Sequence, residues 1–437
     1  MRKRAWIMLS VLAAVCAAAG FFLFHTSYDE KKVAAGADQV LVIDIHRIRN
    51  TLLWEYLQTP ARWHISWPAR SKDSSFSDLV KLPDYAFLFH PKDQPLNAWY
   101  AVFDLKKPGI APLQLKALGF EVSGTIYHSE KLGIDCLLAG NQLIAGNGRL
   151  NDKTLLQQTA VALLKEKKHL SHEAVETYLD QPAHLQWTAA ATPWFEQAGG
   201  TAQFDKTSIS ASVYIQTRDS IGSRPQSFDL PAHALASLSW VQPAGALTQC
   251  LDTATKATIS RWINFSVDSL LGANISRYHF YLPSFQSRID SAITYEYDDA
   301  FNPIEKKTAN AVTEPAFQLQ LTGAGVDRIY QYWRANGNIG SDNIFSPSPF
   351  VAAEAALADS ENLTVSSIHF KPMPTSPSSP ALLLAQLRPP LLPDSLYKYL
   401  PGPLASALQQ CSTITITLEK KTAHTLQLGL HADRRQP

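Results

Sequence analysis

The spacing of apolar and polar positions changes along the chain, and each change predicts an element. Residues 39–45 form a dense run of β-branched and other apolar residues, which predicts a buried strand. Residues 46–57 repeat apolar positions at helical spacing until Pro60, which predicts a helix after that strand. The chain ends with alternating stretches around residues 413–418 and 426–430, which predict a hairpin with one packed and one solvated face.

Short apolar or alternating runs elsewhere predict further strands, at residues 85–90, 98–105, 125–128, 134–138, 142–145, 184–189, 209–216, 230–240, 293–297, 317–321, 363–370 and 381–387. Helical spacing and capping residues predict helices at residues 111–118, 151–164, 171–179, 247–265, 326–333 and 404–410. The expected fold class is α+β, with antiparallel meander sheets that carry helices on one face.

Residues 5–24, AWIMLSVLAAVCAAAGFFLF, are uncharged over a length that matches the hydrocarbon thickness of a bilayer. Residues 1–4 carry Arg2, Lys3 and Arg4, which favour a cytoplasmic N-terminus. We therefore expect a transmembrane signal anchor at residues 5–24 and a tether at residues 25–37. The expected localisation is a single-pass membrane protein with its bulk in the periplasm or outside the cell.

Two alternatives to a retained anchor are open. Cleavage after Ala19 would release a signal peptide, although the apolar run continues through that site to Phe24. Lipidation of Cys16 is the other alternative, although Val15 is larger than the residue that bacterial lipoprotein signals place before the cysteine. All three interpretations predict an exported chain.

The remaining chain is long enough for two domains. A polar stretch without periodicity at residues 217–228 is the expected connection between an α+β lobe at residues 38–216 and a second at residues 229–437. Each lobe begins with a strand followed by an amphipathic helix. A duplicated lobe is one interpretation, and two unrelated lobes are the other.

Composition excludes some classes of function. The chain has 39 basic and 38 acidic side chains, so no overall field attracts nucleic acid, and no nucleic-acid partner is expected. Outside the anchor the cysteines are Cys136, Cys250 and Cys411, an odd number that does not describe a disulfide framework. Whether any two of them form a bridge is left open.

An unusual density of aromatic and basic residues follows the first predicted helix. The residues concerned are Trp54, Arg62, Trp63, His64, Trp67 and Arg70. Indoles and guanidinium groups suit a binding surface for headgroups or for a stacked glycan. The alternative interpretation is that the indoles complete a core beneath the helix.

No strong catalytic, metal or nucleotide motif occurs, and no cofactor is expected. His169 and His172 have a spacing that could serve a metal, but no third ligand is indicated. The glycines of Gly323-Ala-Gly325 follow a strand and open a helix, and we interpret them as a structural turn, because Arg328 replaces the third glycine of a dinucleotide motif. The carboxylates Glu296, Asp298 and Asp299 are interpreted as a solvated strand end.

The chain resembles unannotated, signal-anchored bacterial envelope proteins of domain-of-unknown-function type. The stretches that carry this resemblance are Ala37-Asp-Gln-Val-Leu-Val-Ile-Asp-Ile45 with its helix, the meander from Leu118 to Gly148, and the terminal hairpin. The resemblance implies an envelope location without a mechanism.

The expected function is a non-enzymatic binding, scaffolding or assembly role of a membrane-tethered envelope protein. Its expected partners are the lipid bilayer, through residues 5–24, and another envelope protein or a glycan. A chaperone or carrier for an apolar or lipid ligand is the second hypothesis, and a hydrolase acting on glycan or lipid is the third. An apolar cavity would discriminate among them.

Overall fold

The structure is a computed structural model of the chain. It describes residues 26–435 except 27, 59–75, 93, 95–97, 148–152, 165, 180–181, 193–194, 229–233, 242–252, 264–265, 298–302, 347–351, 368–379, 399 and 401.

The fold class differs from the expected one. Strands hold 45% of the described residues and helices 25%, so the described part of the chain is built mainly of antiparallel sheet. The longest described helix, α2 (Ile45–Gln58), has 14 residues, whereas a membrane span needs about 20. In the described ranges no helix is long and apolar enough to cross a bilayer. The predictions of an N-terminal transmembrane helix and of single-pass localisation are corrected on this finding, and residues 5–24 themselves lie outside the described residues.

The chain divides into two compact units. Unit 1 comprises residues 1–206 and 211–216, and unit 2 comprises residues 207–210 and 217–437. Residues 217–228, predicted as a connection, lie within unit 2, where the Ile221 N–H donates to the carbonyl of Ala423.

The elements of unit 1 follow one another as η1 (Glu30–Lys32), β1 (Ala37–Asp44), α2, α3 (Phe76–Leu79), β2 (Tyr85–Pro91), β3 (Tyr100–Asp104), η3 (Pro108–Ile110), α4 (Ala111–Ala117), β4 (Glu121–Ser123), β5 (Ile126–Ser129), β6 (Ile134–Ala139), β7 (Gln142–Gly146), α5 (Lys153–Leu164), α6 (His172–Leu179), β8 (Leu185–Ala189) and β9 (Phe195–Phe204), with β10 (Ser208–Thr217) divided between the units. The strands pair in the order β9-β8-β1-β2-β3-β7-β6-β5-β4.

The turn from β1 into α2 shows how local sequence produces this order. Asp44 ends the strand, and its carboxylate accepts a hydrogen bond of 2.6 Å from the backbone N–H of Arg47 in the first turn of the helix. An aspartate that caps a helix in this way satisfies one of the N–H groups that the helix leaves unpaired. The helix therefore begins directly at the end of the strand.

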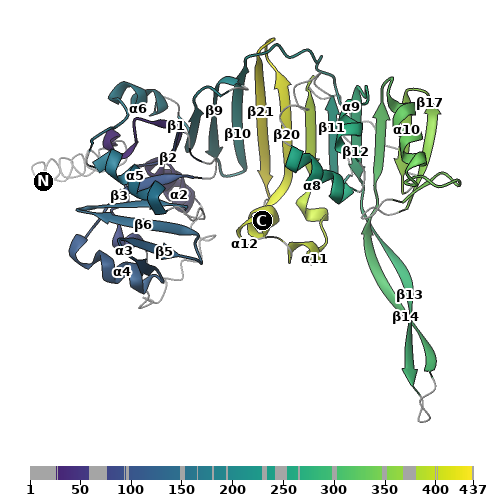
Figure 1. The fold of residues 1–437 in the computed structure, drawn as a ribbon, viewed down its shortest axis with the longest axis horizontal. Helices are drawn as coiled ribbons and strands as arrows, with labels where there is room; N and C mark the ends of the chain where they lie inside the picture. Colours follow the sequence, from purple (N-terminus) through teal and green to yellow (C-terminus); the bar gives the residue numbers. More distant parts are fainter. Residues whose placement is uncertain are drawn as a thin grey trace, which may run out of the picture. The chain divides into compact units, whose positions relative to one another are not determined.

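Both faces of the unit 1 sheet carry helices, which corrects the prediction that helices pack on one face. We call the face that carries Val40 and Val42 face A, and the opposite face, which carries Leu41, face B. Face A packs against α5 and α6 in a core that includes Leu163 and Val175. Face B packs against α3 and α4, whose Leu79 and Leu115 are fully buried. Within unit 1, Figure 1 shows α5 and α3–α4 on either side of the strands.

The elements of unit 2 follow one another as β11 (Ala236–Val241), α8 (Thr253–Ile263), α9 (Val267–Gly272), β12 (Arg277–Leu282), β13 (Phe285–Tyr297), β14 (Pro303–Pro315), β15 (Gln318–Thr322), α10 (Val326–Ala335), β16 (Ile344–Phe345), β17 (Ala353–Asp359), β18 (Asn362–Ser366), β19 (Leu383–Leu387), η4 (Pro389–Leu391), α11 (Asp394–Tyr397), α12 (Gly402–Gln409), β20 (Cys411–Lys420) and β21 (Thr425–Arg434).

Unit 2 repeats the strand order of unit 1. Its strands pair as β20-β19-β11-β12-β15-β18-β17-β16. These correspond, in this order, to β9-β8-β1-β2-β3-β7-β6-β5 of unit 1, and corresponding strands follow one another in the same sequence along the chain. Unit 2 adds the two-stranded hairpin β13–β14 between β12 and β15 (Figure 1). In unit 1 only a short connection joins the equivalent strands β2 and β3.

The registers allow the two units to be matched residue by residue. Because Asp44 ends β1 and Val241 ends β11, we match these two residues and follow the ladders outward. In this match the corresponding strands β2 and β12 have the same burial pattern at their start. Each begins with one half-buried residue followed by two buried ones. Faces A and B can therefore be compared between the units.

Candidate functional site

An apolar cavity of about 640 Å³ lies on face B of unit 1. Cavities that bind small ligands have volumes of about 300–1,000 Å³, so this one has the size of a ligand site. It is lined by Leu41, Phe76, Leu88, Trp99, Tyr100, Ala101, Phe103, Phe120, Leu132, Ile134, Ala145, Gly146 and Asn147. We call it the groove.

Strand pairing brings together the residues that form the floor of the groove. Leu41 pairs with Leu88 across β1 and β2, Leu88 pairs with Ala101 of β3, and Ala101 pairs with Ala145 of β7. Directly paired residues point to the same face of a sheet, so these four side chains form one row across the strands. Two of the four are alanines, and their small side chains leave the depth that larger residues would fill.

Aromatic and aliphatic side chains form the walls. The Phe76 ring of α3 meets the Phe103 ring edge to face, with 5.9 Å between their centroids. Phe76 and Leu132 also border the solvent, because 38% and 56% of their surfaces are exposed. The groove is therefore accessible from the α3 side.

A glycine lies at one end of the groove. A Cβ at Gly146 would lie 2.7 Å from the ring of Tyr100, closer than carbon atoms can approach. Gly146 therefore allows that ring to lie across β7 on face A, where Tyr100 belongs to the same core as Val40 and Val42 and its hydroxyl donates a 3.0 Å hydrogen bond to Gln94. The ring thus faces away from the floor of the groove. The Trp99 N–H donates a 2.9 Å hydrogen bond to the side-chain oxygen of Asn147 beside it.

The lining offers contact area and little reactivity. None of the lining residues is charged. Cys136, which pairs with Ala145 on β7, is fully buried, and this burial, with a smaller contribution from Asp135, raises the pKa of its thiol to about 12. The thiol therefore stays protonated and is not a nucleophile at neutral pH. The arrangement suits retention of an apolar molecule.

Face B of unit 2 holds larger side chains at the matched positions. Phe280 stands at the place of Leu88, Leu319 at that of Ala101, and Val365 at that of Ala145. Val365 and the indole of Trp333 on α10 are buried in the same core. The positions that are small in unit 1 are thus filled in unit 2.

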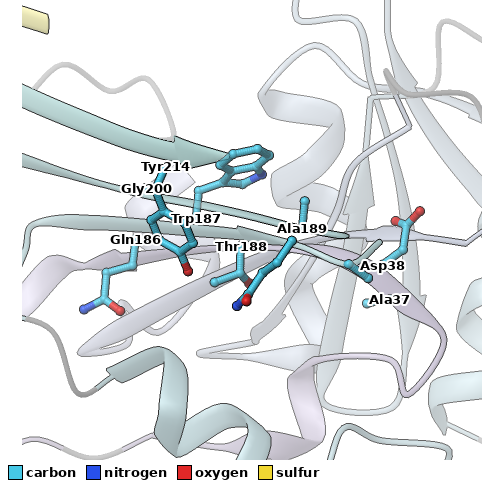
Figure 2. Close-up of a pocket in the computed structure, with 10 residues that line it drawn as sticks. Ala37, Asp38, Gln186, Trp187, Thr188, Ala189, Gly200 and Tyr214 are labelled. Carbon is cyan, nitrogen blue, oxygen red and sulfur yellow. The ribbon is translucent and has the colours of Figure 1, made fainter. Parts of the chain in front are cut away.

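A second cavity of about 270 Å³ lies over β8 and β9 in unit 1 (Figure 2). Figure 2 shows the side chains of Gln186 and Thr188 on one side of the strands and the indole of Trp187 on the other. Trp187 pairs with Leu41, so its indole lies on face B. The second cavity is more polar and smaller than the usual ligand site, and the groove is the stronger candidate.

The predicted binding surface is largely outside the described residues. Trp54 lies on α2 with 57% of its surface exposed and does not line the groove. The other five residues, Arg62, Trp63, His64, Trp67 and Arg70, lie outside the described residues, and the surface stays a prediction. The structure instead shows the groove, whose lining includes Ala101 and Ala145 within two of the predicted strands. An alanine within a strand does not by itself indicate a cavity.

The two histidines considered as metal ligands have separate surroundings. The His172 ring stacks on Tyr28 with 5.6 Å between centroids, whereas His169 forms an isolated bridge with Ala34. Among the described residues no group of three or more His, Cys, Asp or Glu side chains is placed to hold a metal ion.

The glycine turn between β15 and α10 is structural, as interpreted from the sequence. A Cβ at Gly323 would lie 2.6 Å from the backbone nitrogen of Ser276, and Gly323 has a positive φ of 144°. The close approach of two backbone segments therefore requires a glycine there.

The remaining cysteines and carboxylates are only partly described. Cys136 and Cys411 are buried free thiols. Cys250, Asp298 and Asp299 lie outside the described residues.

Comparison with known proteins gives no family. No family model matches the chain, and no curated protein matches it. Among solved structures, crystal form III of TP0453 aligns with a TM-score of 0.28 at 11% identity, covering 57% of this chain and 91% of that chain. Crystal form I of TP0453 aligns with a TM-score of 0.27 at 11% identity, covering 58% and 91%. Likeness at this level establishes neither fold nor function.

Proposed function

We propose that unit 1 binds an apolar ligand of the acyl-chain type in the groove and that this binding is non-enzymatic. The observation that carries the proposal is the groove itself, a cavity of about 640 Å³ with an uncharged, almost entirely apolar lining. Ligand sites are typically apolar cavities with a few polar groups at their edge, and Asn147 and Trp99 occupy such a position here.

The chemistry of the lining favours a carrier over a hydrolase. Hydrolysis of a glycan or lipid needs an acid, a base or an activated nucleophile beside the substrate. The groove residues supply none, and the neighbouring Cys136 thiol stays protonated because its pKa is raised. An unbranched hydrocarbon chain, by contrast, gains about 0.8 kcal/mol for each methylene that it buries.

The test uses the residues of unit 2 to fill the groove of unit 1. A dansyl-labelled long-chain fatty acid is titrated into the full chain and into the Ala101→Leu/Ala145→Val variant. We expect the wild type to bind and the variant to lose about tenfold or more in affinity, because the new side chains occupy the floor. The control, Ala257→Leu/Ala309→Val, makes the same two changes at exposed positions of unit 2 and should bind like the wild type.

Two results would overturn the proposal. One is equal binding by the wild type, the filled variant and the control, and the other is no binding by the wild type. If thermal melting shows that the filled variant does not fold, Leu132→Gln replaces it. Leu132 is 56% exposed at the rim, so this change should spare the fold and still weaken binding.

A further inference from the structure

The surface around α4 combines exposed apolar residues with lysines. Leu82, Ile110 and Leu113 have 67%, 40% and 69% of their surfaces exposed. Leucine and isoleucine at such exposure, grouped on neighbouring segments, differ from the scattered single residues that are normal on protein surfaces. The lysines that surround them are exposed as well: Lys81, Lys106, Lys107 and Lys116. We call these seven residues the α4 surface.

Backbone pairing brings these residues together. The N–H of Lys81 donates to the carbonyl of Asp104 at 2.7 Å, and the N–H of Lys106 donates to that of Leu79 at 3.0 Å. The segments that carry Leu82 and Lys106 therefore lie side by side, and η3 and α4 follow directly. Figure 1 shows α3 and α4 next to each other in unit 1.

The helix α4 is apolar on two sides. Ala111 and Leu115 point into the core beneath the helix and are fully buried. Ile110 and Leu113, three residues apart, share the outward side with Lys116. A core helix needs only the inward stripe, so the outward apolar residues are not explained by the packing of unit 1.

The charge around α4 favours a negatively charged partner. The carboxylate of Asp104 forms an ion pair with Lys32 at 2.9 Å. The four lysines of the α4 surface outnumber the two acidic residues of the adjoining residues 76–84, Asp78 and Asp84. Apolar side chains flanked by lysines are typical of protein surfaces that bind the interface of anionic lipid. The α4 surface also adjoins the groove, because α3, which packs on α4, carries the wall residue Phe76.

We propose that the α4 surface docks on a lipid surface that carries negative charge, and that the groove exchanges its ligand there. The proposal rests on the proposed function, since an apolar ligand is concentrated in lipid and not in water. Lysines attract the anionic headgroups, and Leu82, Ile110 and Leu113 enter the apolar layer below them.

The experiment places an environment-sensitive bimane label at Leu113→Cys in the full chain, with Cys16 and Cys250 replaced by serine. Cys136 and Cys411 are buried and should stay unlabelled. The label reports the surroundings of residue 113 alone, so other contacts between chain and vesicle do not contribute. The control carries the label at Leu404→Cys on α12, where 47% of the leucine is exposed.

We expect a blue shift at residue 113 with equimolar phosphatidylcholine–phosphatidylglycerol vesicles, and none with phosphatidylcholine alone or at residue 404. High salt should reduce the shift. Lys106→Glu/Lys107→Glu should weaken vesicle binding by about tenfold or more. The matched reversal Lys306→Glu/Lys307→Glu on β14 should leave the binding unchanged. The same shift at both label positions, or a shift that is insensitive to the Lys106 and Lys107 reversal, would overturn the proposal.

The two proposals fail separately. Lys106→Glu/Lys107→Glu should still bind the dansyl fatty acid in solution, and Ala101→Leu/Ala145→Val should still show the vesicle-dependent shift. Loss of docking with intact ligand binding leaves the groove function standing. A shift without any ligand binding removes the groove function.

Discussion

Units 1 and 2 share one strand order but differ in what each face carries. Face A is apolar in unit 1, where α5 and α6 cover residues such as Val42 and Phe87. The matched residues of unit 2 are Ser239 and His279, which are buried and joined by a 2.8 Å hydrogen bond. The same ladder thus supports an apolar face in one unit and a polar, hydrogen-bonded face in the other.

Face B differs in another way, because it is closed by a helix in unit 2 and only partly covered in unit 1. In unit 2 it is closed by α10, whose Trp333 is 1% exposed and lies 5.0 Å from the ring of Phe345. In unit 1 the shorter helix α4 covers only part of the face, and alanines lie on the rest. The comparison indicates that side-chain size at a few paired positions and the length of the covering helix, and not topology, determine whether this sheet holds a groove.

The largest expected effect comes from giving face B of unit 2 the small residues that unit 1 has at the matched positions. Leu319→Ala/Val365→Ala should lower the free energy of unfolding by about 2 kcal/mol or more, because Val365 is fully buried and Leu319 half-buried in one core, and a cavity remains where their side chains were. Apolar cavities of this kind stay dry and bind apolar molecules, so the fatty acid stoichiometry should rise from about one to about two per chain. Urea unfolding and fluorescence titration measure both quantities. Unchanged stoichiometry despite the lost stability would show that side-chain size alone does not make the site.

A smaller effect is expected when face A of unit 2 receives residues of unit 1. Ser239→Val removes the hydroxyl that bonds to Nδ1 of His279, and loss of a buried partner costs about 1–3 kcal/mol. Adding His279→Phe, the residue that unit 1 has at this position, replaces both partners by apolar groups and should recover most of the loss. A double variant less stable than the single one, measured by urea unfolding, would contradict the match between the faces.

The elements with a clear period were predicted well, and the others were not. The strand at residues 39–45, the helix at residues 111–118 and the terminal hairpin are present as β1, α4 and β20–β21. β9 was missed because Ala198-Gly199-Gly200 lacks the β-branched residues that indicate strands. β12 was missed because His279 lies among its aromatic residues and removes the contrast between the two faces.

The groove could not be predicted because its lining comes from distant segments. Leu41 and Ala145 meet only through the pairings of β1, β2, β3 and β7, which do not follow chain order beyond β3. The local signal, an alanine in a strand, is also common in ordinary packing. The transmembrane prediction is corrected on a different ground, because no helix of the described residues is long and apolar enough to cross a bilayer. It concerned residues 5–24, which lie outside the described residues.

The smallest expected effect is a dependence of stability on pH that arises from a histidine of unit 1. Nδ1 of His184 accepts a 3.1 Å hydrogen bond from the Phe204 N–H, and Nε2 lies 2.9 Å from the hydroxyl of Thr51. Burial, and then the charge of Arg47, lower the pKa of His184. The unfolded chain therefore binds the proton more readily, and stability should fall as the pH drops below about 6.5.

Unit 2 has Leu382 at the matched position, directly before β19. His184→Leu should therefore flatten the dependence of unfolding free energy on pH between about 7.5 and 5.5. Urea titrations at several pH values give this slope. An unchanged slope in the variant would assign the pH dependence to other groups.

The central claim is that the hydrocarbon chain of a bound ligand lies on face B of unit 1 and not at the matched place in unit 2. The most direct measurement is photolabelling of the full chain with a diazirine-bearing fatty acid, followed by peptide mass mapping. The account predicts labels on β2, β3 and β7, in residues 85–91, 100–104 and 142–146, and their loss in Ala101→Leu/Ala145→Val. Labels at residues 277–282, 318–322 and 362–366 instead, or labelling that the filled variant retains, would contradict it.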